Sequence, residues 1–240
     1  INFTRNRNKI IELYPGVSSY DLVLAFGADV VAKAIEGEEY GMVETGHGFA
    51  IYQAKDANGN PIAHPNNGMR VIGSAPNGAT NGAYTFMRSQ DYNGTRKRLG
   101  SIMEKFLLST TQEFRYKNFN LNIFLDSKIG GLMASATHQY GSANGSMKNS
   151  LFGRTAELGG VEYIDNGVKT YDGIIPDGVL NDNISVTVAG NTVNLGGMTY
   201  AEAVENGYLQ PIPAYVYYEN LSQWSSGIRE YSVFENSWVA

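Results

Sequence analysis

Residues 114–140, FRYKNFNLNIFLDSKIGGLMASATHQY, decide the fold class of this chain. The first half of the stretch has a period of 2, in which apolar residues alternate with amides. The apolar positions are Phe119, Leu121, Ile123 and Leu125. The amide positions are Asn118, Asn120 and Asn122. The stretch therefore predicts an extended strand with one oily face and one polar face.

The second half predicts that the chain turns and runs back. Ser127–Gly131 ends in two glycines, which adopt the positive φ angles of tight turns without steric cost. From Leu132 to Tyr140 apolar and polar residues alternate again. The interpretation is a hairpin with arms 114–126 and 132–140.

The polar face indicates where such a hairpin would lie. Three asparagines on one face are unfavourable in a hydrophobic core, because each buried amide needs a hydrogen-bonding partner. They suit the water-filled lumen of a transmembrane barrel, whose other face contacts lipid. We therefore expect Asn118, Asn120 and Asn122 to line a lumen. Lipid-facing residues would be Phe119, Leu121, Ile123 and Leu125.

The composition is compatible with a β-barrel, and it argues against a helical membrane protein and a nucleic-acid-binding protein. In 240 residues there are 28 glycines and 16 tyrosines, as in β-rich chains with many turns and interfacial aromatics. No apolar run reaches the length of about 18 residues that a membrane helix needs. There is no cysteine, and the net charge of −5 with scattered bases argues against a nucleic-acid partner.

Four strands of membrane length are predicted: residues 1–8, the two hairpin arms, and 231–240. Between them lie two long segments, 9–113 and 141–228, which the alternation of short and long connections places outside the cell. The expected fold is all-β, with residues 1–240 forming part of one large antiparallel transmembrane β-barrel. A chain that starts at Ile1 and ends within a strand is also expected to be a fragment or a processed product.

Within the long segments, local patterns predict smaller elements. Residues 18–35 fit either a helix or short strands around Gly27. Residues 46–66 predict a hairpin with Asn58-Gly59 as its turn. A glycine- and proline-rich loop follows at 66–82. The spacing of apolar residues predicts either a short amphipathic helix within 95–108 or a loop segment packed on its neighbours. A capping-box pattern at Thr199–Glu202 predicts a helix over 200–206 that stops at Gly207.

Four strings resemble the C-terminal barrel region of SusC/RagA-type TonB-dependent outer-membrane transporters. They are NFTRNRNKIIEL (2–13), FRYKNFNLNIFLDSKIGG (114–131), YDGIIPDG (171–178) and YSVFENSWVA (231–240). Their order and spacing are similar to that family. The N-terminal plug and the final closing strands of such transporters have no counterpart in this sequence.

The resemblance implies a share in the import of a bulky nutrient, an oligosaccharide or a peptide, across the bacterial outer membrane. It implies a SusD-like surface lipoprotein as a lid, energy from the TonB complex through the missing N-terminal part, and pairing of two transporter–lipoprotein units. No enzymatic activity and no cofactor are expected. The protein would be multi-pass, with most of this segment facing the cell exterior.

An aromatic cluster in the second long segment is the candidate binding surface. It comprises Tyr208, Tyr215, Tyr217, Tyr218 and Trp224. Flat rings can stack on a ligand or act as anchors in a protein interface, and they can equally pack a loop or form an interfacial girdle. These roles stay open from the sequence.

Metal binding finds little support. His47, His64 and His138 lack the paired spacing of a metal site. A series of loop aspartates lacks the dense alternation of a calcium loop and suits turns instead. Its members are Asp165, Asp172, Asp177 and Asp182.

Two interpretations from other classes remain. A virion or other assembly protein could be equally rich in glycine and asparagine and would self-associate in water. A secreted β-rich glycan-binding or glycan-cleaving domain would pack the face of Leu121 against a second sheet.

Overall fold

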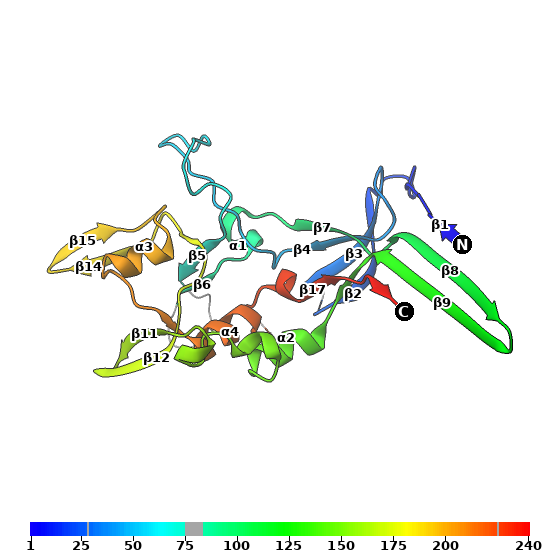
Figure 1. The fold of residues 1–240 in the computed structure, drawn as a ribbon. Coiled ribbons are helices and arrows are strands. Elements are labelled where there is room, and N and C mark those ends of the chain that lie inside the picture. Colours follow the sequence, from blue (N-terminus) through cyan, green and yellow to red (C-terminus); the bar gives the residue numbers. More distant parts are fainter. Residues whose placement is uncertain (28, 75–83, 225) are drawn as a thin grey trace. The chain divides into compact units, whose positions relative to one another are not determined.

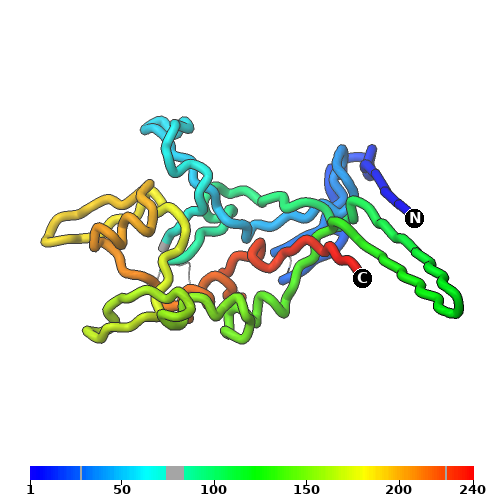
Figure 2. The backbone as a smooth tube through the Cα atoms, viewed as in Figure 1, coloured from blue at the N-terminus to red at the C-terminus, as the bar shows by residue number. Residues whose placement is uncertain are grey.

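The computed structural model describes residues 1–27, 29–74, 84–224 and 226–240 (Figure 1). The protein is mostly β, with 42% strand and 17% helix in several small antiparallel sheets, and the described residues form no closed barrel. Two compact units share the chain. Unit 1 comprises 1–45, 97–135 and 233–240, and unit 2 comprises 46–96 and 136–232. Figure 2 traces this order along the backbone by colour.

A four-stranded antiparallel sheet in unit 1 contains the decisive stretch of sequence. Its strand order is β1-β8-β9-β18. The strands are β1 (Asn2–Thr4), β8 (Glu104–Tyr116), β9 (Phe119–Gly130) and β18 (Trp238–Val239). Strands β8 and β9 form a long hairpin whose closing pair is Tyr116 and Phe119. Only Lys117 and Asn118 connect them, and Lys117 has a positive φ of 53°.

A hairpin forms here, but the predicted arms and turn were wrong: residues 114–126 do not pair with 132–140, and β9 pairs instead with β8. Ser127 and Lys128 lie within β9, where they pair with Leu108 and Leu107. Gly130 and Gly131 do have positive φ angles, yet they end β9 instead of reversing the chain. The predicted helix within 95–108 was also wrong, since that segment forms β7 (Lys97–Ser101) and the start of β8. The five apolar residues within 95–108 are spaced irregularly, so their pattern fits a pair of strands as well as a helix.

A second four-stranded sheet completes most of unit 1, in the order β2-β3-β4-β7. Its other strands are β2 (Ser19–Ala25), β3 (Val30–Ile35) and β4 (Met42–Thr45). The strand alternative for 18–35 is thus confirmed. Phe26, Val30 and Val43 form a small buried core on one face of this sheet. Lys33 and Arg98 pair with Glu44 on the other face, at 3.4 and 3.1 Å.

The predicted strand over 231–240 is two short strands. The segment begins in a 3-10 helix (Arg229–Ser232) and continues as β17 (Val233–Glu235) before β18. Strand β17 pairs with β10 (Leu132–Ala134). Of the predicted return arm, only β10 is a strand. The rest of that arm is helical.

The described residues of unit 2 form three small sheets. A mixed sheet has β5 (Val71–Ser74) between β13 (Val179–Leu180), its parallel partner, and β6 (Tyr84–Phe86). An antiparallel sheet contains β11 (Val161–Asp165), β12 (Val168–Ile174) and β16 (Ile212–Pro213). A separate hairpin is formed by β14 (Ser185–Val188) and β15 (Asn191–Asn194).

Short helices complete unit 2. They are α1 (Ser89–Asn93), α2 (Ala136–Ala143), α3 (Tyr200–Glu205), α4 (Ala214–Ser222) and the 3-10 helices Lys148–Leu151, Ala156–Leu158 and Arg229–Ser232. Helix α3 confirms the prediction from the capping box, because Thr199 accepts a hydrogen bond from the amide of Glu202 while the Glu202 carboxylate accepts from Thr199. Ile72, Leu180, Leu195 and Ile228 are fully enclosed in the main core of the unit.

The predicted hairpin over 46–66 is present only as a turn. Asp56 and Asn60 are hydrogen-bonded around Asn58-Gly59, and Lys55 and Pro61 form a single bridge. Of the loop predicted at 66–82, residues 75–82 lie outside the part of the chain that the structure describes.

Candidate functional site

The sheet that contains the β8–β9 hairpin has a largely apolar face, which Thr110, Gln112 and Ser127 interrupt. Residues that pair directly across antiparallel strands point to the same side of a sheet. Phe119 pairs with Tyr116 and Leu121 with Phe114, so these four side chains share a face. Phe3 of β1 joins the same face, and its ring lies 5.6 Å from that of Phe106. The large apolar residues predicted to meet lipid, Phe119, Leu121, Ile123 and Leu125, are all exposed.

The opposite face of the hairpin is mostly polar. Asn120 and Asn122 pair with Arg115 and Glu113 there. Asn118 differs from the expectation of three asparagines in a row along a strand, because it lies in the two-residue connection at the tip. Phe124, on the polar side, is the main interruption. Both faces of this part of the hairpin are therefore open to the surroundings.

Both edges of the hairpin are also open toward its tip. Strand β1 pairs only with Leu107–Ser109 of β8, and β18 only with Ser127 and Lys128 of β9. Among the described residues, the backbone from Thr110 to Leu125 has no further strand on either side. None of the described helices is long and apolar enough to span a membrane.

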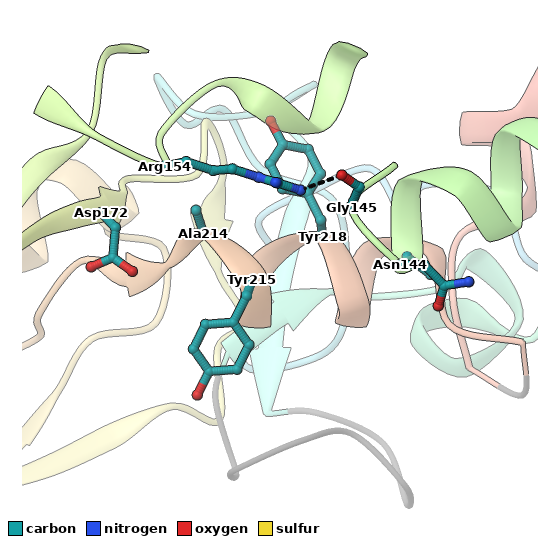
Figure 3. A pocket seen from close by; sticks show the side chains of 8 residues that line it. Asn144, Gly145, Arg154, Asp172, Ala214, Tyr215 and Tyr218 are labelled. Atoms are coloured by element: carbon teal, nitrogen blue, oxygen red, sulfur yellow. Dashed lines mark hydrogen bonds between the residues drawn. The ribbon is translucent and has the colours of Figure 1, made fainter. Parts of the chain in front are cut away.

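A pocket of about 400 Å³ lies on unit 2 (Figure 3). Its lining combines a guanidinium, a carboxylate, an amide and tyrosine rings. The lining residues are Ala143, Asn144, Gly145, Arg154, Asp172, Ala214, Tyr215 and Tyr218. In Figure 3, Asp172 and Asn144 lie on either side of Tyr215. A shallow hollow adjoins this pocket and shares Arg154 and Asp172 with it.

Carbonyl groups of the surrounding loops hold Arg154 in place. Its Nε donates to the Ser150 carbonyl oxygen at 2.7 Å, and Nη2 donates to the Gly145 carbonyl oxygen at 2.6 Å. The loop that carries Arg154 is close-packed at Gly160, where a β-carbon would lie 2.2 Å from the Tyr171 carbonyl oxygen. The guanidinium is thus fixed before any ligand arrives.

The structure separates the predicted aromatic cluster into three environments. Tyr215 and Tyr218 both lie on α4 and line the pocket. Burial raises the pKa of Tyr218, which keeps its hydroxyl protonated. Tyr218 also belongs to the buried core of unit 2, and Tyr208 and Tyr217 pack against that core. Burial raises the pKa of Tyr217 as well. Trp224 stacks on Tyr140.

Four residues of this surface were missed from the sequence: Tyr140, Asn144, Arg154 and Asp172. Asp172 was considered only as a turn residue, within the string YDGIIPDG, and all four come from segments that only packing brings together. The glycines around Arg154 were the one available signal of a close-packed loop. Among the described residues, no group of three or more histidine, aspartate or glutamate side chains could hold a metal ion.

Comparison with known proteins adds no assignment. No family model matches the chain, and no curated protein matches it.

Proposed function

We propose that this chain is part of a transmembrane β-barrel of the TonB-dependent importer class, in which the β8–β9 hairpin belongs to the barrel wall and long, partly structured segments before and after it are extracellular. The observation that carries the proposal is the exposed apolar face of the β8–β9 hairpin. In water, a face formed by Phe114, Phe119, Leu121 and their neighbours would cost free energy at roughly 25 cal/mol per Å². In a bilayer the same face is favourable.

Strand length supports the proposal. A membrane-spanning strand needs about 9–11 residues, and β8 and β9 have 13 and 12. The face with Asn120 and Asn122 would then line the water-filled interior. Alternation of apolar and polar side chains along the same strands is typical of barrel walls.

The open edges of the hairpin support a barrel wall as well. Unpaired backbone groups are not tolerated in lipid, so a strand edge in a membrane must pair with another strand. The outer parts of β8 and β9 would meet neighbouring strands of the same barrel. A hairpin with an apolar face and two free edges is a poor design for a protein that stays in water.

Unit 2 suits the role of an extracellular segment. It is folded around its own core, and it carries a pocket with convergent polar and aromatic groups, as binding sites commonly do. The imported nutrient would be an oligosaccharide or a peptide, with a SusD-like lipoprotein as the lid and the TonB complex as the energy source. Transport of this kind needs differential binding and no catalytic residue.

Fractionation of the native protein tests this proposal. We expect it in the outer membrane, extracted only by detergent, and purified together with a surface lipoprotein. A detergent-free, water-soluble protein would contradict it. A soluble assembly would then favour the virion or assembly interpretation, and a soluble monomer the secreted glycan-binding domain.

A further inference from the structure

The sheet formed by β2, β3, β4 and β7 in unit 1 has two different faces. Across it, Val23 pairs with Ala32, and Ala32 with Val43, so these three side chains share one face. Lys33 and Glu44, the next residues along β3 and β4, point to the opposite face and form an ion pair at 3.4 Å. The apolar face is therefore separate from this ion pair.

An apolar cavity of about 320 Å³ is lined by this face and by the β10–β17 pair. Its lining consists only of alanine, valine, leucine, isoleucine and methionine side chains. The lining is buried at Val30 and Val43, which belong to the small core of unit 1. It is open to the surroundings at Val23 and Met133, which are 58% and 47% exposed. A ligand here would need an apolar surface, because polar groups would find no side-chain partner on these walls.

Small side chains leave this space unfilled. Ala25, Ala32 and Ala134 all line the cavity, whereas leucines at such positions would fill it as in a packed core. An unfilled apolar cavity costs stability, because the atoms that line it lose contacts on one side. A hydrocarbon ligand would restore those contacts.

A lysine ammonium group lies beside the cavity. A β-carbon at position 131 would lie 3.6 Å from Nζ of Lys128 and 2.8 Å from the carbonyl oxygen of Ile102. Ile102 and Leu132, the residue after Gly131, both line the cavity. The ammonium group of Lys128 is therefore next to the end of the cavity that Ile102 and Leu132 form.

This ammonium group has no carboxylate partner among the described residues. The neighbouring Glu235 pairs with Lys105, at 3.4 Å. Asp126, on the same face of β9, accepts a hydrogen bond from the amide of Ser127. A free cation beside an apolar cavity is complementary to a ligand with an anionic head and a hydrocarbon tail.

The volume of the cavity limits the tail to one chain of moderate length. A methylene group is about as large as a water molecule, which takes about 30 Å³ in the liquid, so the cavity holds roughly ten carbons. A phospholipid, with two longer chains, would leave most of its hydrocarbon outside. A single-chain carboxylate fits both the volume and the charge.

We infer that this cavity of unit 1 binds the tail of a medium-chain fatty acid, whose carboxylate pairs with Lys128. The inference goes beyond the proposed importer and does not depend on it. The cavity and Lys128 both lie within one compact unit of the chain.

The test uses the full native protein and isothermal titration calorimetry with sodium decanoate below its micelle concentration. A membrane protein would be held in lipid nanodiscs, with empty nanodiscs as the blank, because an alkyl detergent would compete for the cavity. We expect saturable binding of one decanoate per chain. From hexanoate to decanoate the Kd should fall about fourfold with each added methylene, as expected for burial of that group. Decanol, which has the same tail without the charge, should bind about tenfold more weakly.

Two variants test the two parts of the site. Ala25→Leu fills part of the cavity and should raise the Kd for decanoate about tenfold. Leu24→Phe is its control, because it adds volume on the opposite face of β2 and should bind normally. Lys128→Gln should raise the Kd for decanoate about tenfold and leave that for decanol unchanged. Lys117→Gln, which removes an exposed charge from the tip of the same hairpin, should bind both normally.

The inference is overturned if decanoate binding does not saturate, if decanol binds as tightly as decanoate, or if didecanoylphosphatidylglycerol binds more tightly. Normal binding by Ala25→Leu would overturn it as well. A circular dichroism spectrum checks that each variant is folded, and if Ala25→Leu is not, the comparison of Lys128→Gln with Lys117→Gln decides. An outer-membrane protein that binds no decanoate defeats this inference and leaves the importer standing. A water-soluble protein that binds decanoate through Lys128 defeats the importer and keeps the site.

Discussion

Phe114 on β8 and Leu121 on β9 are direct partners across the hairpin, and both are exposed, at 54% and 41%. One residue further along β9, Asn122 faces the other side of the sheet and pairs with Glu113. A single strand therefore offers two neighbouring positions whose surroundings differ completely if the sheet lies in a membrane. Substitutions at these two positions therefore test which face of the sheet contacts lipid and which faces the lumen.

Leu121→Arg should impair insertion into the outer membrane. An arginine on the lipid side costs about 2–4 kcal/mol near the middle of the bilayer and less toward its surface, where Leu121, the third residue of β9, would lie. Asn122→Arg is the matched control, because its new guanidinium would face water and Glu113. Heat-modifiable migration and surface protease sensitivity measure insertion in cells. Equal insertion of both variants would contradict the assignment of the two faces.

Thr199→Ala should destabilise α3. The hydroxyl of Thr199 accepts from the Glu202 amide at 3.2 Å, and its loss leaves a helix amide without its cap. Loss of such a cap costs about 1 kcal/mol. Thr199→Ser keeps the hydroxyl and should behave almost normally. Hydrogen exchange of the α3 amides measures the effect, and similar protection in both variants would show that the cap does not contribute.

Several parts of this fold were predictable because local chemistry determines them. Alternation of side chains gave the two faces of β9, and the capping box gave α3. The turn at Lys117-Asn118 was not predictable, because a lysine with positive φ has no sequence signature and the glycines nearby are a stronger signal. The alternation of apolar and polar residues over 132–140 was too short to distinguish a strand from the helix α2 that forms there.

The candidate site was predictable only in part. Tyr215 and Trp224 belong to an aromatic cluster that is visible in the sequence, but the roles of its members depend on burial. Tyr217, two residues after Tyr215, points toward Phe86 and the core because a helix turns by 100° per residue. Arg154 and Asn144 reach the pocket through loops whose packing no local pattern encodes.

His138 should make α2 sensitive to mild acid. Its Nδ1 lies 3.1 Å from the Ser232 hydroxyl and its Nε2 lies 3.0 Å from the Asn149 amide nitrogen. Burial lowers the pKa of His138 below its usual 6.5, because the charged ring loses hydration. The unfolded state therefore binds a proton more readily than the folded state does. Stability is fully present above pH 6.5 and falls as the pH drops through the lowered pKa.

Hydrogen exchange of α2 as a function of pH measures this effect. Protection should be constant above pH 6.5 after correction for intrinsic exchange, and it should decrease in acid. The variant His138→Gln keeps a polar side chain without a titrating ring, so its protection should not show that decrease. Identical acid profiles for the two proteins would assign the effect to other groups.

Gly160→Ala should disorder the wall of the pocket that carries Arg154. A β-carbon at position 160 would lie 2.2 Å from the Tyr171 carbonyl oxygen and 2.6 Å from that of Gly153, so the backbone must move. Overpacking of this kind costs about 1–3 kcal/mol. Gly190→Ala is the comparison, because position 190 has open space and only a positive φ of 84° to strain an alanine. Limited proteolysis of the native protein should show new cleavage between residues 153 and 171 in Gly160→Ala alone. Normal resistance of that segment would mean that the close packing at Gly160 does not hold Arg154 in place.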